Sequence, residues 1–262
     1  MNIVVCAKQV IDPEAPSAVF SIDEASKKGI NTDGSPPVLD PYGEYALEAA
    51  LKLKAAAGGK VTVITMGTGL VTNVVKKSLA MGADELILLE DEAFGDMDAY
   101  GTAYGLSLAI KKLGGFDLIL TGRESSDTNA GQTGSGIAEI LGLPCVILAK
   151  QIDIDGGQVK VQRVITDGYE VVTAPLPAVI TVSNEIGEVR FPTMKGIMAA
   201  KKITPTIYKS ADVGMDASVS RKSKMMKLYQ EISEAHCEFI KGESPEEMVG
   251  NLTERLRAAK LF

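Results

Sequence analysis

The sequence has little of what most enzyme active sites are built from. Its 262 residues include one histidine, His236, three cysteines and no tryptophan. The stretch around the histidine, SEAHCEFIKG, offers no partner for an imidazole, so we expect neither a Ser-His-Asp triad nor a zinc site. The odd number and wide spacing of the cysteines argue against a disulfide framework. We therefore assign no catalytic and no metal-binding residue.

Long apolar runs and excess positive charge are also missing. An apolar run of about 18 residues, the length of a membrane-spanning helix, does not occur. The opening stretch, MNIVVCAKQV, lacks the basic flank of a signal peptide. The net charge of −7 disfavours nucleic acid as a partner. We expect a cytoplasmic protein that binds neither membranes nor nucleic acid.

Apolar, strand-like runs alternate with helix-like runs over the first part of the chain. The strands are predicted at 2–7, 60–66, 85–90, 116–122 and 144–149, and the helices at 41–56, 71–82, 98–114 and 130–142. Strands that are apolar almost throughout are typical of a parallel sheet covered on both faces. The pattern predicts a doubly wound, mostly parallel α/β fold, in which ligands bind beyond the carboxyl ends of the strands.

Other patterns interrupt and follow this alternation. Residues 8–40 are predicted to form a long connection, ending at a helix start with Asp40 as its N-cap. A β-hairpin region is predicted at about 150–183, with a DGG turn, so that residues 1–190 form one α/β domain. Residues 191–262 look too few to form a hydrophobic core of their own. This favours an arm that lies on a partner, and a partly disordered tail is the alternative. Ser244 and Glu247 predict a capping box before a last helix.

The loop TGRESSDTNAGQTGS, residues 121–135, is the strongest candidate for a binding site. It follows a strand, and the helix predicted to begin near Ala130 would point its N-terminus into the crevice, where free N–H groups favour an anion. The loop has one cation, Arg123, and many neutral donors, while Gly131 and Gly134 allow close approach. This composition predicts a phosphate site. It lacks GxxxxGK[ST], so it is no Walker loop, and a plain surface loop is the alternative.

The ends of the other strands are predicted to complete the crevice. Ala7 and Lys8 end the first strand, Met66 and Gly67 end the second, and Pro41 and Tyr42 begin the first helix. The stretch GTGLVT at 67–72 is an incomplete dinucleotide fingerprint, which is also compatible with a simple tight turn. Tyr42 is equally compatible with a core position.

Together these stretches resemble the beta (small) subunit of an electron-transfer flavoprotein. The resemblance spans the chain and rests on VVCAKQVID, DPYGEYALEAA, VITMG, LAMGADE, GRESSDTNAGQTG, LPAVITVSNEIGEVRF and GIMAAKK. It implies a heterodimer with an FAD-bearing alpha subunit, and a nucleotide held at Ala7, Asp40, Pro41, Tyr42, Met66, Arg123, Ser125, Asp127, Thr128, Asn129, Ala130, Gly131, Gln132, Thr133 and Gly134. It also implies contact with a flavin-containing dehydrogenase through Met194, Ile197 and Met198.

The loop departs from the pattern of the AMP-binding members of this family. Those members usually have several acids and a bulky residue there, whereas Asp127 is followed here by Thr128, Asn129, Ala130 and Gly131. Fewer acids and smaller side chains leave room for a second phosphate. This favours FAD over AMP, and with it an electron-bifurcating member that takes electrons from NADH and passes them toward ferredoxin and a dehydrogenase. The alternatives are an ordinary electron carrier with structural AMP and a universal-stress-type ATP-binding module.

Overall fold

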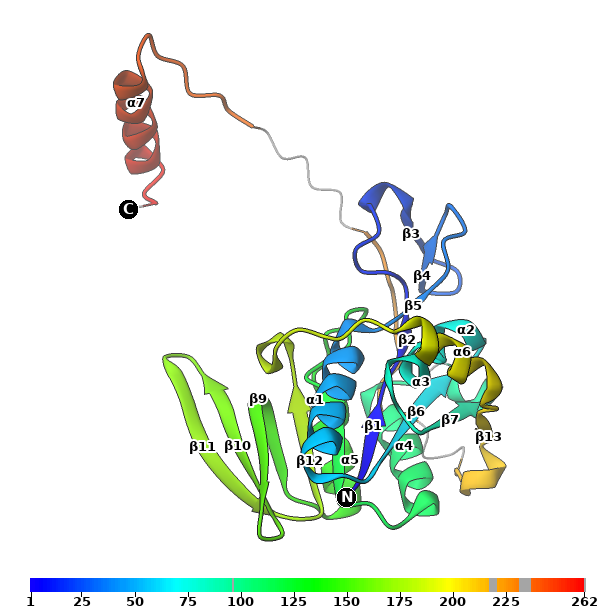
Figure 1. Cartoon of the computed structure of the whole chain (residues 1–262). Helices are drawn as coiled ribbons and strands as arrows, with labels where there is room; N and C mark the ends of the chain where they lie inside the picture. Colours follow the sequence, from blue (N-terminus) through cyan, green and yellow to red (C-terminus); the bar gives the residue numbers. More distant parts are fainter. Residues whose placement is uncertain (96, 217–220, 231–236, 262) are drawn as a thin grey trace. The chain divides into compact units, whose positions relative to one another are not determined.

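The computed structural model describes residues 1–95, 97–216, 221–230 and 237–261 (Figure 1). The chain forms two compact units, Met1–Leu228 and Tyr229–Phe262. The first unit therefore extends beyond the predicted domain boundary at residue 190.

A nine-stranded sheet organises the first unit. Its strand order is β11-β10-β9-β12-β8-β1-β6-β7-β13. The bounds are β1 Asn2–Cys6, β6 Lys60–Gly67, β7 Glu85–Glu90, β8 Leu118–Gly122, β9 Cys145–Asp155, β10 Gln158–Ile165, β11 Gly168–Pro175, β12 Ala178–Val182 and β13 Thr206–Tyr208. β1 runs parallel to both β6 and β8, so the chain switches direction across the sheet beside β1. The predicted doubly wound, mostly parallel α/β class is confirmed.

Helices cover both faces of the sheet (Figure 1). One face is covered by α1 (Pro41–Ala57), α2 (Thr72–Val75), α3 (Lys77–Met81) and α6 (Met194–Lys202), and the other by α4 (Ala99–Leu113) and α5 (Thr133–Leu141). Alternate residues of β1 enter the two cores, Ile3 and Val5 on the α1 side and Val4 on the α4 side. Because side chains alternate along a strand, burial on both faces requires the unbroken apolar run seen in the sequence.

Three elements differ from the sequence prediction. The helix predicted at 71–82 is divided at Lys76 into α2 and α3. The connection at 8–40 contains two small antiparallel pairs, β2 (Gln9–Val10) with β5 (Val38–Leu39) and β3 (Phe20–Asp23) with β4 (Lys28–Asn31). The strand predicted at 144–149 continues into the hairpin as the single strand β9. Strands of two to four residues are too short to show alternation in the sequence, which is why they were missed.

The predicted hairpin region is confirmed, although the strand after it, β12, joins the parallel part of the sheet. Gly156 and Gly157 adopt positive φ angles of 54° and 82° between β9 and β10, as a tight two-residue turn requires. β11 adds an antiparallel edge, while β12 inserts in parallel between β8 and β9. Near this junction Leu148 has a φ of 60°, and its N–H donates to Thr181 Oγ1 at 3.1 Å.

Residues 191–228 belong to the first unit. Thr193 caps α6, and a Cβ at Gly196 would lie 2.2 Å from the Ala80 carbonyl oxygen, so glycine lets α6 approach α3 closely. β13 then pairs with β7 at the sheet edge. In the second unit, Ser244 caps α7 (Pro245–Ala258) as predicted, although Glu247 accepts from the Glu243 N–H and not from that of Ser244.

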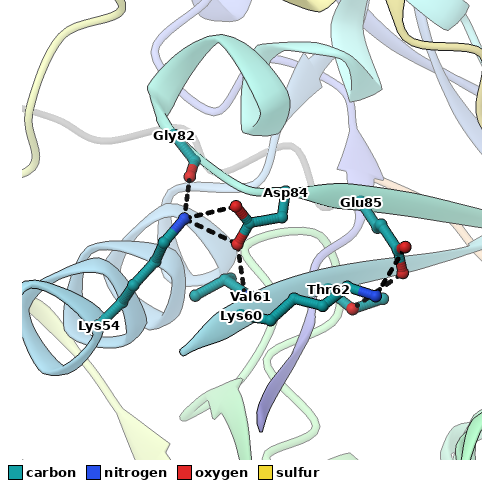
Figure 2. A network of polar contacts seen from close by, with 7 residues as sticks. All are labelled: Lys54, Lys60, Val61, Thr62, Gly82, Asp84 and Glu85. Carbon is teal, nitrogen blue, oxygen red and sulfur yellow. Dashed lines mark hydrogen bonds and ion pairs between the residues drawn. The ribbon is translucent and has the colours of Figure 1, made fainter. Parts of the chain in front are cut away.

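The amino ends of β6 and β7 are joined by a polar network (Figure 2). The ammonium group of Lys54, on α1, donates to both carboxylate oxygens of Asp84 at 2.6 and 2.7 Å, and Asp84 also accepts from the Val61 N–H at 2.7 Å. Lys60 pairs with Glu85 at 2.6 Å. The LAMGADE stretch therefore stabilises the end of the sheet opposite to the predicted site.

Candidate functional site

The predicted crevice lies at the carboxyl ends of β1, β6 and β8. The loop 123–132 leaves β8 and leads into α5, which begins at Thr133 and not near Ala130. Asn129 and Gly131 have φ angles of 48° and 62°, a left-handed conformation that keeps this part of the loop out of the helix. The prediction of the helix start was wrong by about one turn for this reason.

The first turn of α5 rests directly on the sheet. A Cβ at Gly134 would lie 2.6 Å from both Thr121 Oγ1 on β8 and Thr181 Cγ2 on β12. The two threonines are in register on adjacent strands. Only glycine allows this approach, which sets the height of the helix N-terminus above the strands.

The helix N-terminus has the features of an anion site. The Gly136 N–H donates to the Gln132 carbonyl at 2.8 Å, and the earlier amide groups precede the intrahelical ladder. Within the described part of the chain, the side chain of Gln132 does not cap the helix. Exposed amides and the helix dipole together favour negative charge at this position.

The first half of the loop is fastened to β1 and α1. Asp40 Oδ1 accepts from Ser126 N at 3.1 Å and from Ser126 Oγ at 2.7 Å. Lys8 pairs with Asp127 at 2.7 Å. Burial raises the pKa of Asp40, against the hydrogen bonds from Ser126. Among the described residues, the Asp40 carboxylate does not cap α1 as predicted, because it binds Ser126 instead.

A second link joins the loop to α1 through Tyr42. The Tyr42 hydroxyl donates to Glu124 Oε1 at 3.0 Å, and Arg123 donates to the same oxygen from Nε at 3.2 Å and from Nη2 at 2.5 Å. The guanidinium carbon lies 5.7 Å from the centre of the Tyr42 ring. Hydrogen bonding to Arg123 lowers the pKa of Glu124, and burial together with the Glu124 bond raises that of Tyr42. Tyr42 is half-buried in this cluster and is not a core residue.

The second half of the loop makes mainly local contacts. Thr128 and Asn129 donate their N–H groups to the Ser125 carbonyl at 3.3 and 2.8 Å, and the Ser125 and Thr128 hydroxyls lie 3.0 Å apart. Residues 127–132 are exposed. This half offers its small polar side chains and backbone to a ligand, while the first half holds it in place.

The turn after β6 uses two of its backbone amides in hydrogen bonds within the protein. The Leu70 N–H donates to Glu90 at 3.2 Å, and the Val71 N–H donates to Gln9 Oε1 at 2.7 Å. Met66 and Gly67 end β6, and the Met66 side chain lies against Gly105 of α4. The GTGLVT stretch is therefore a tight turn, with two of its amide groups already bonded.

The structure gathers most of the predicted site residues at the carboxyl ends of the central strands. The contacts above connect Asp40 and Tyr42 with the loop, and Ala7 lies against Gly43 of α1. Pro41 begins α1, while Met66 and Gly67 lie on the other side of β1. Sequence reasoning missed Glu124 and Ser126. Their partners Tyr42 and Asp40 are 82 and 86 positions away, a separation at which no local pattern indicates a contact.

The predicted partner-binding residues lie on α6. Met194 and Met198 are 76% and 55% exposed, whereas Ile197 packs against the core. Phe191, which the sequence reading did not single out, is 90% exposed just before this helix. An outward contact would thus use Phe191, Met194 and Met198.

Other sites considered from the sequence add little. His236 lies outside the described residues. Among those that are described, no three His, Cys, Asp or Glu side chains are placed to hold a metal ion. Across the same residues, no helix has the length and apolar character needed to cross a membrane. The Cys6 thiol is buried, which raises its pKa to about 12 and makes it unreactive.

Fold and site together define a doubly wound α/β protein with an anion-favouring helix N-terminus at its switch point. Residues 28–213 match the electron transfer flavoprotein domain. The chain is 35% identical over 262 residues, 98% of each chain, to the caffeyl-CoA reductase-Etf complex subunit CarD of Acetobacterium woodii. It is also 35% identical to the electron transfer flavoprotein subunit beta of Megasphaera elsdenii, over 100% of both chains, and to that of Thermoanaerobacterium thermosaccharolyticum, over 98% of both. The chain belongs to the electron transfer flavoprotein family, as one of its beta subunits.

Proposed function

We propose that this beta subunit binds FAD at the carboxyl ends of β1, β6 and β8, in front of the N-terminus of α5, and takes part in electron bifurcation. In this proposal electrons come from NADH and pass to a ferredoxin-type acceptor and, through the alpha subunit, to a flavin-containing dehydrogenase. One relative at 35% identity is named as a subunit of a caffeyl-CoA reductase-Etf complex, which supports the assembly with a reductase. We place the complex in the cytoplasm.

The observation that carries the FAD assignment is the shape of the loop before α5. Gly134 brings the helix N-terminus down onto Thr121 and Thr181, and Asn129 and Gly131 curve the loop around the space in front of it. Small residues line this curve, and their amides and hydroxyls supply neutral donors for phosphate oxygens. The residues present therefore fit a pyrophosphate better than the bulkier, more acidic loop of AMP-binding members would.

The chain's own residues would bind and orient the cofactor. FAD supplies the redox chemistry when bound, and the protein supplies position and electrostatics. Thr128 to Gly134 would hold the phosphates, and Ala7, Asp40, Pro41, Tyr42, Met66 and Gly67 would form the walls. No residue of the site is assigned a proton-transfer role.

Nucleotide content tests this proposal directly. The chain is co-expressed with its alpha subunit, the complex is extracted with acid, and the released nucleotides are separated by chromatography. We expect two FAD per heterodimer. One FAD with one AMP would reject the FAD assignment and leave an ordinary electron carrier, while ATP would indicate the stress-protein alternative.

A matched pair of glycine variants locates the nucleotide. Gly131 and Gly142 have φ angles of 62° and 68°, at opposite ends of α5, and neither has a described atom closer than 3.7 Å to an added Cβ. Gly131→Val and Gly142→Val should therefore cost similar backbone strain, about 1–2 kcal/mol. Only Gly131→Val should empty the beta site while the alpha-site FAD remains. Equal nucleotide loss in both variants would remove the loop from the site.

The partner surface has its own test. Met194→Ala should slow electron transfer to the dehydrogenase without changing flavin content, because it removes an exposed apolar anchor. Met226→Ala is a suitable control, since Met226 is 78% exposed and Met194 76%. Unchanged transfer kinetics in Met194→Ala would count against α6 as the contact.

A further inference from the structure

Glu124 has a role in the crevice that the proposed phosphate contacts do not explain. Its Oε1 atom accepts three hydrogen bonds, from the Tyr42 hydroxyl at 3.0 Å and from Arg123 at 3.2 and 2.5 Å. Arg123 is the one cation between residues 121 and 135. The loop's positive charge is therefore already bound to a carboxylate.

The backbone holds this cluster in place. A Cβ at Gly122 would lie 2.5 Å from Tyr42 Cβ and 2.9 Å from the Glu124 carbonyl oxygen, so the end of β8 and the first turn of α1 are in tight contact. The guanidinium lies 5.7 Å from the Tyr42 ring centre, within the range of a cation–π contact. Arg123 is thus held between the Glu124 carboxylate and an aromatic face.

The neighbouring cation is also paired with an acid of the loop. Lys8, at the end of β1, pairs with Asp127 at 2.7 Å. Both cations are paired to acids of the loop, so the donors of the proposed site that carry no charge are the amides of the α5 N-terminus and the polar side chains of residues 128–133.

A neutral site discriminates between phosphate types. A phosphate monoester such as that of AMP carries about −1.5 to −2 at pH 7 on a single group. Each phosphate of the pyrophosphate diester in FAD carries one charge. A free arginine binds a concentrated dianion strongly, through two parallel hydrogen bonds, and would favour the monoester.

We infer that Glu124 is a specificity-determining residue, which holds Arg123 away from the phosphates and so favours the diester of a dinucleotide over a nucleoside monophosphate. This rests on the proposed function, since it concerns the same crevice. Glu124 acts through Arg123 and Tyr42 and need not touch the ligand.

Glu124→Gln tests the inference. The amide oxygen can still accept from Tyr42, but the charge that holds Arg123 is lost. Dissociation constants for AMP and FAD are measured on the full-length chain in complex with its alpha subunit, after the beta-site nucleotide has been removed. We expect affinity for AMP to rise relative to that for FAD by about tenfold, as one released arginine–phosphate contact predicts.

Two controls separate this effect from general charge and from folding. Glu139→Gln removes the same charge from an exposed position on α5 and should leave the ratio of affinities unchanged. The double variant Arg123→Gln, Glu124→Gln should return the ratio to that of the wild type. Thermal unfolding of each variant reports whether the fold is intact.

Two results would overturn the inference. One is an unchanged ratio in a stable Glu124→Gln variant, and the other is a shift that persists in the double variant. Wild-type protein that binds neither nucleotide in the crevice would overturn the proposed function and this inference with it, a result easily distinguished from an unchanged ratio.

Discussion

The two ends of the parallel strands are built in different ways. At the amino ends, Asp84 joins α1, β6 and β7 through bonds of 2.6 to 2.7 Å (Figure 2). At the carboxyl ends, the loop 123–132 is fastened over its first half and exposed over its second. One end fixes the sheet geometry, and the other leaves exposed the donors that we propose bind a ligand. Variants at each end should separate stability from binding.

The largest effect is expected where the site itself touches the sheet. Gly134→Ala places a methyl group 2.6 Å from Thr121 and Thr181, so the first turn of α5 must move. Overpacking of this kind costs about 3 kcal/mol of the free energy of unfolding. Urea denaturation measures it, with Gly250→Ala on α7 as the control for glycine replacement within a helix, because an added Cβ there meets no atom within 4 Å. A loss no greater than that of the control would show that the helix end can shift freely.

A smaller loss is expected at the amino end. Asp84→Ala leaves the N–H of the fully buried Val61 without its acceptor, which costs about 2 kcal/mol of the free energy of unfolding. Asp84→Asn keeps an acceptor and loses mainly the partly exposed ion pair with Lys54, which costs less than about 1 kcal/mol. Nucleotide content should stay at the wild-type level in both. Loss of nucleotide from either variant would contradict the division between the two ends.

A local, pH-dependent effect is expected at Asp98, the N-cap of α4. Its carboxylate accepts from Gly101 N at 2.8 Å, and from Lys222 N and Ser223 N at 2.7 Å each. Although burial opposes the shift, these bonds lower the pKa of Asp98 to about 2. Because the folded-state pKa lies below the usual 3.8, the stabilisation is complete above about pH 4 and is lost as the pH falls toward 2.

Hydrogen exchange tests this contact. Asn can still cap α4 but places a donor against the segment 221–223, so in Asp98→Asn the amides there should exchange roughly tenfold faster at neutral pH. Asp91→Asn is a matched control, because Asp91 caps a turn and accepts from Ser210 N and Oγ in the same way. Equal exchange in wild type and Asp98→Asn would show that Asp98 does not hold the segment.

The smallest effect is expected for Lys8→Met. The pair with Asp127 is 42% and 34% exposed in its side chains, so water and salt screen it. The free energy of unfolding should change by less than about 0.5 kcal/mol. A larger loss in urea denaturation would mean that Lys8 holds the loop more firmly than the exposed geometry indicates.

The sequence predicted the fold better than the details of the site. Unbroken apolar runs predicted the parallel strands, because such runs suit strands buried on both faces. The start of α5 was misplaced, because positive φ angles at Asn129 and Gly131 are a property of the folded loop. Asp40 was assigned to its own helix, whereas its carboxylate binds Ser126, 86 positions away. The nucleotide contacts themselves stay predictions.

Local composition by itself determined the fold class, the hairpin turn at Gly156 and Gly157, the cap at Ser244, and the small polar character of the loop 121–135. These features depend on backbone preferences and hydrophobic periodicity over a few residues. Tertiary structure alone decided that β12 lies between β8 and β9, that Gly134 rests on two threonines, and that Glu124 holds Arg123 and Tyr42. Each of these joins segments far apart in the chain, and packing, not local preference, selects which distant groups meet.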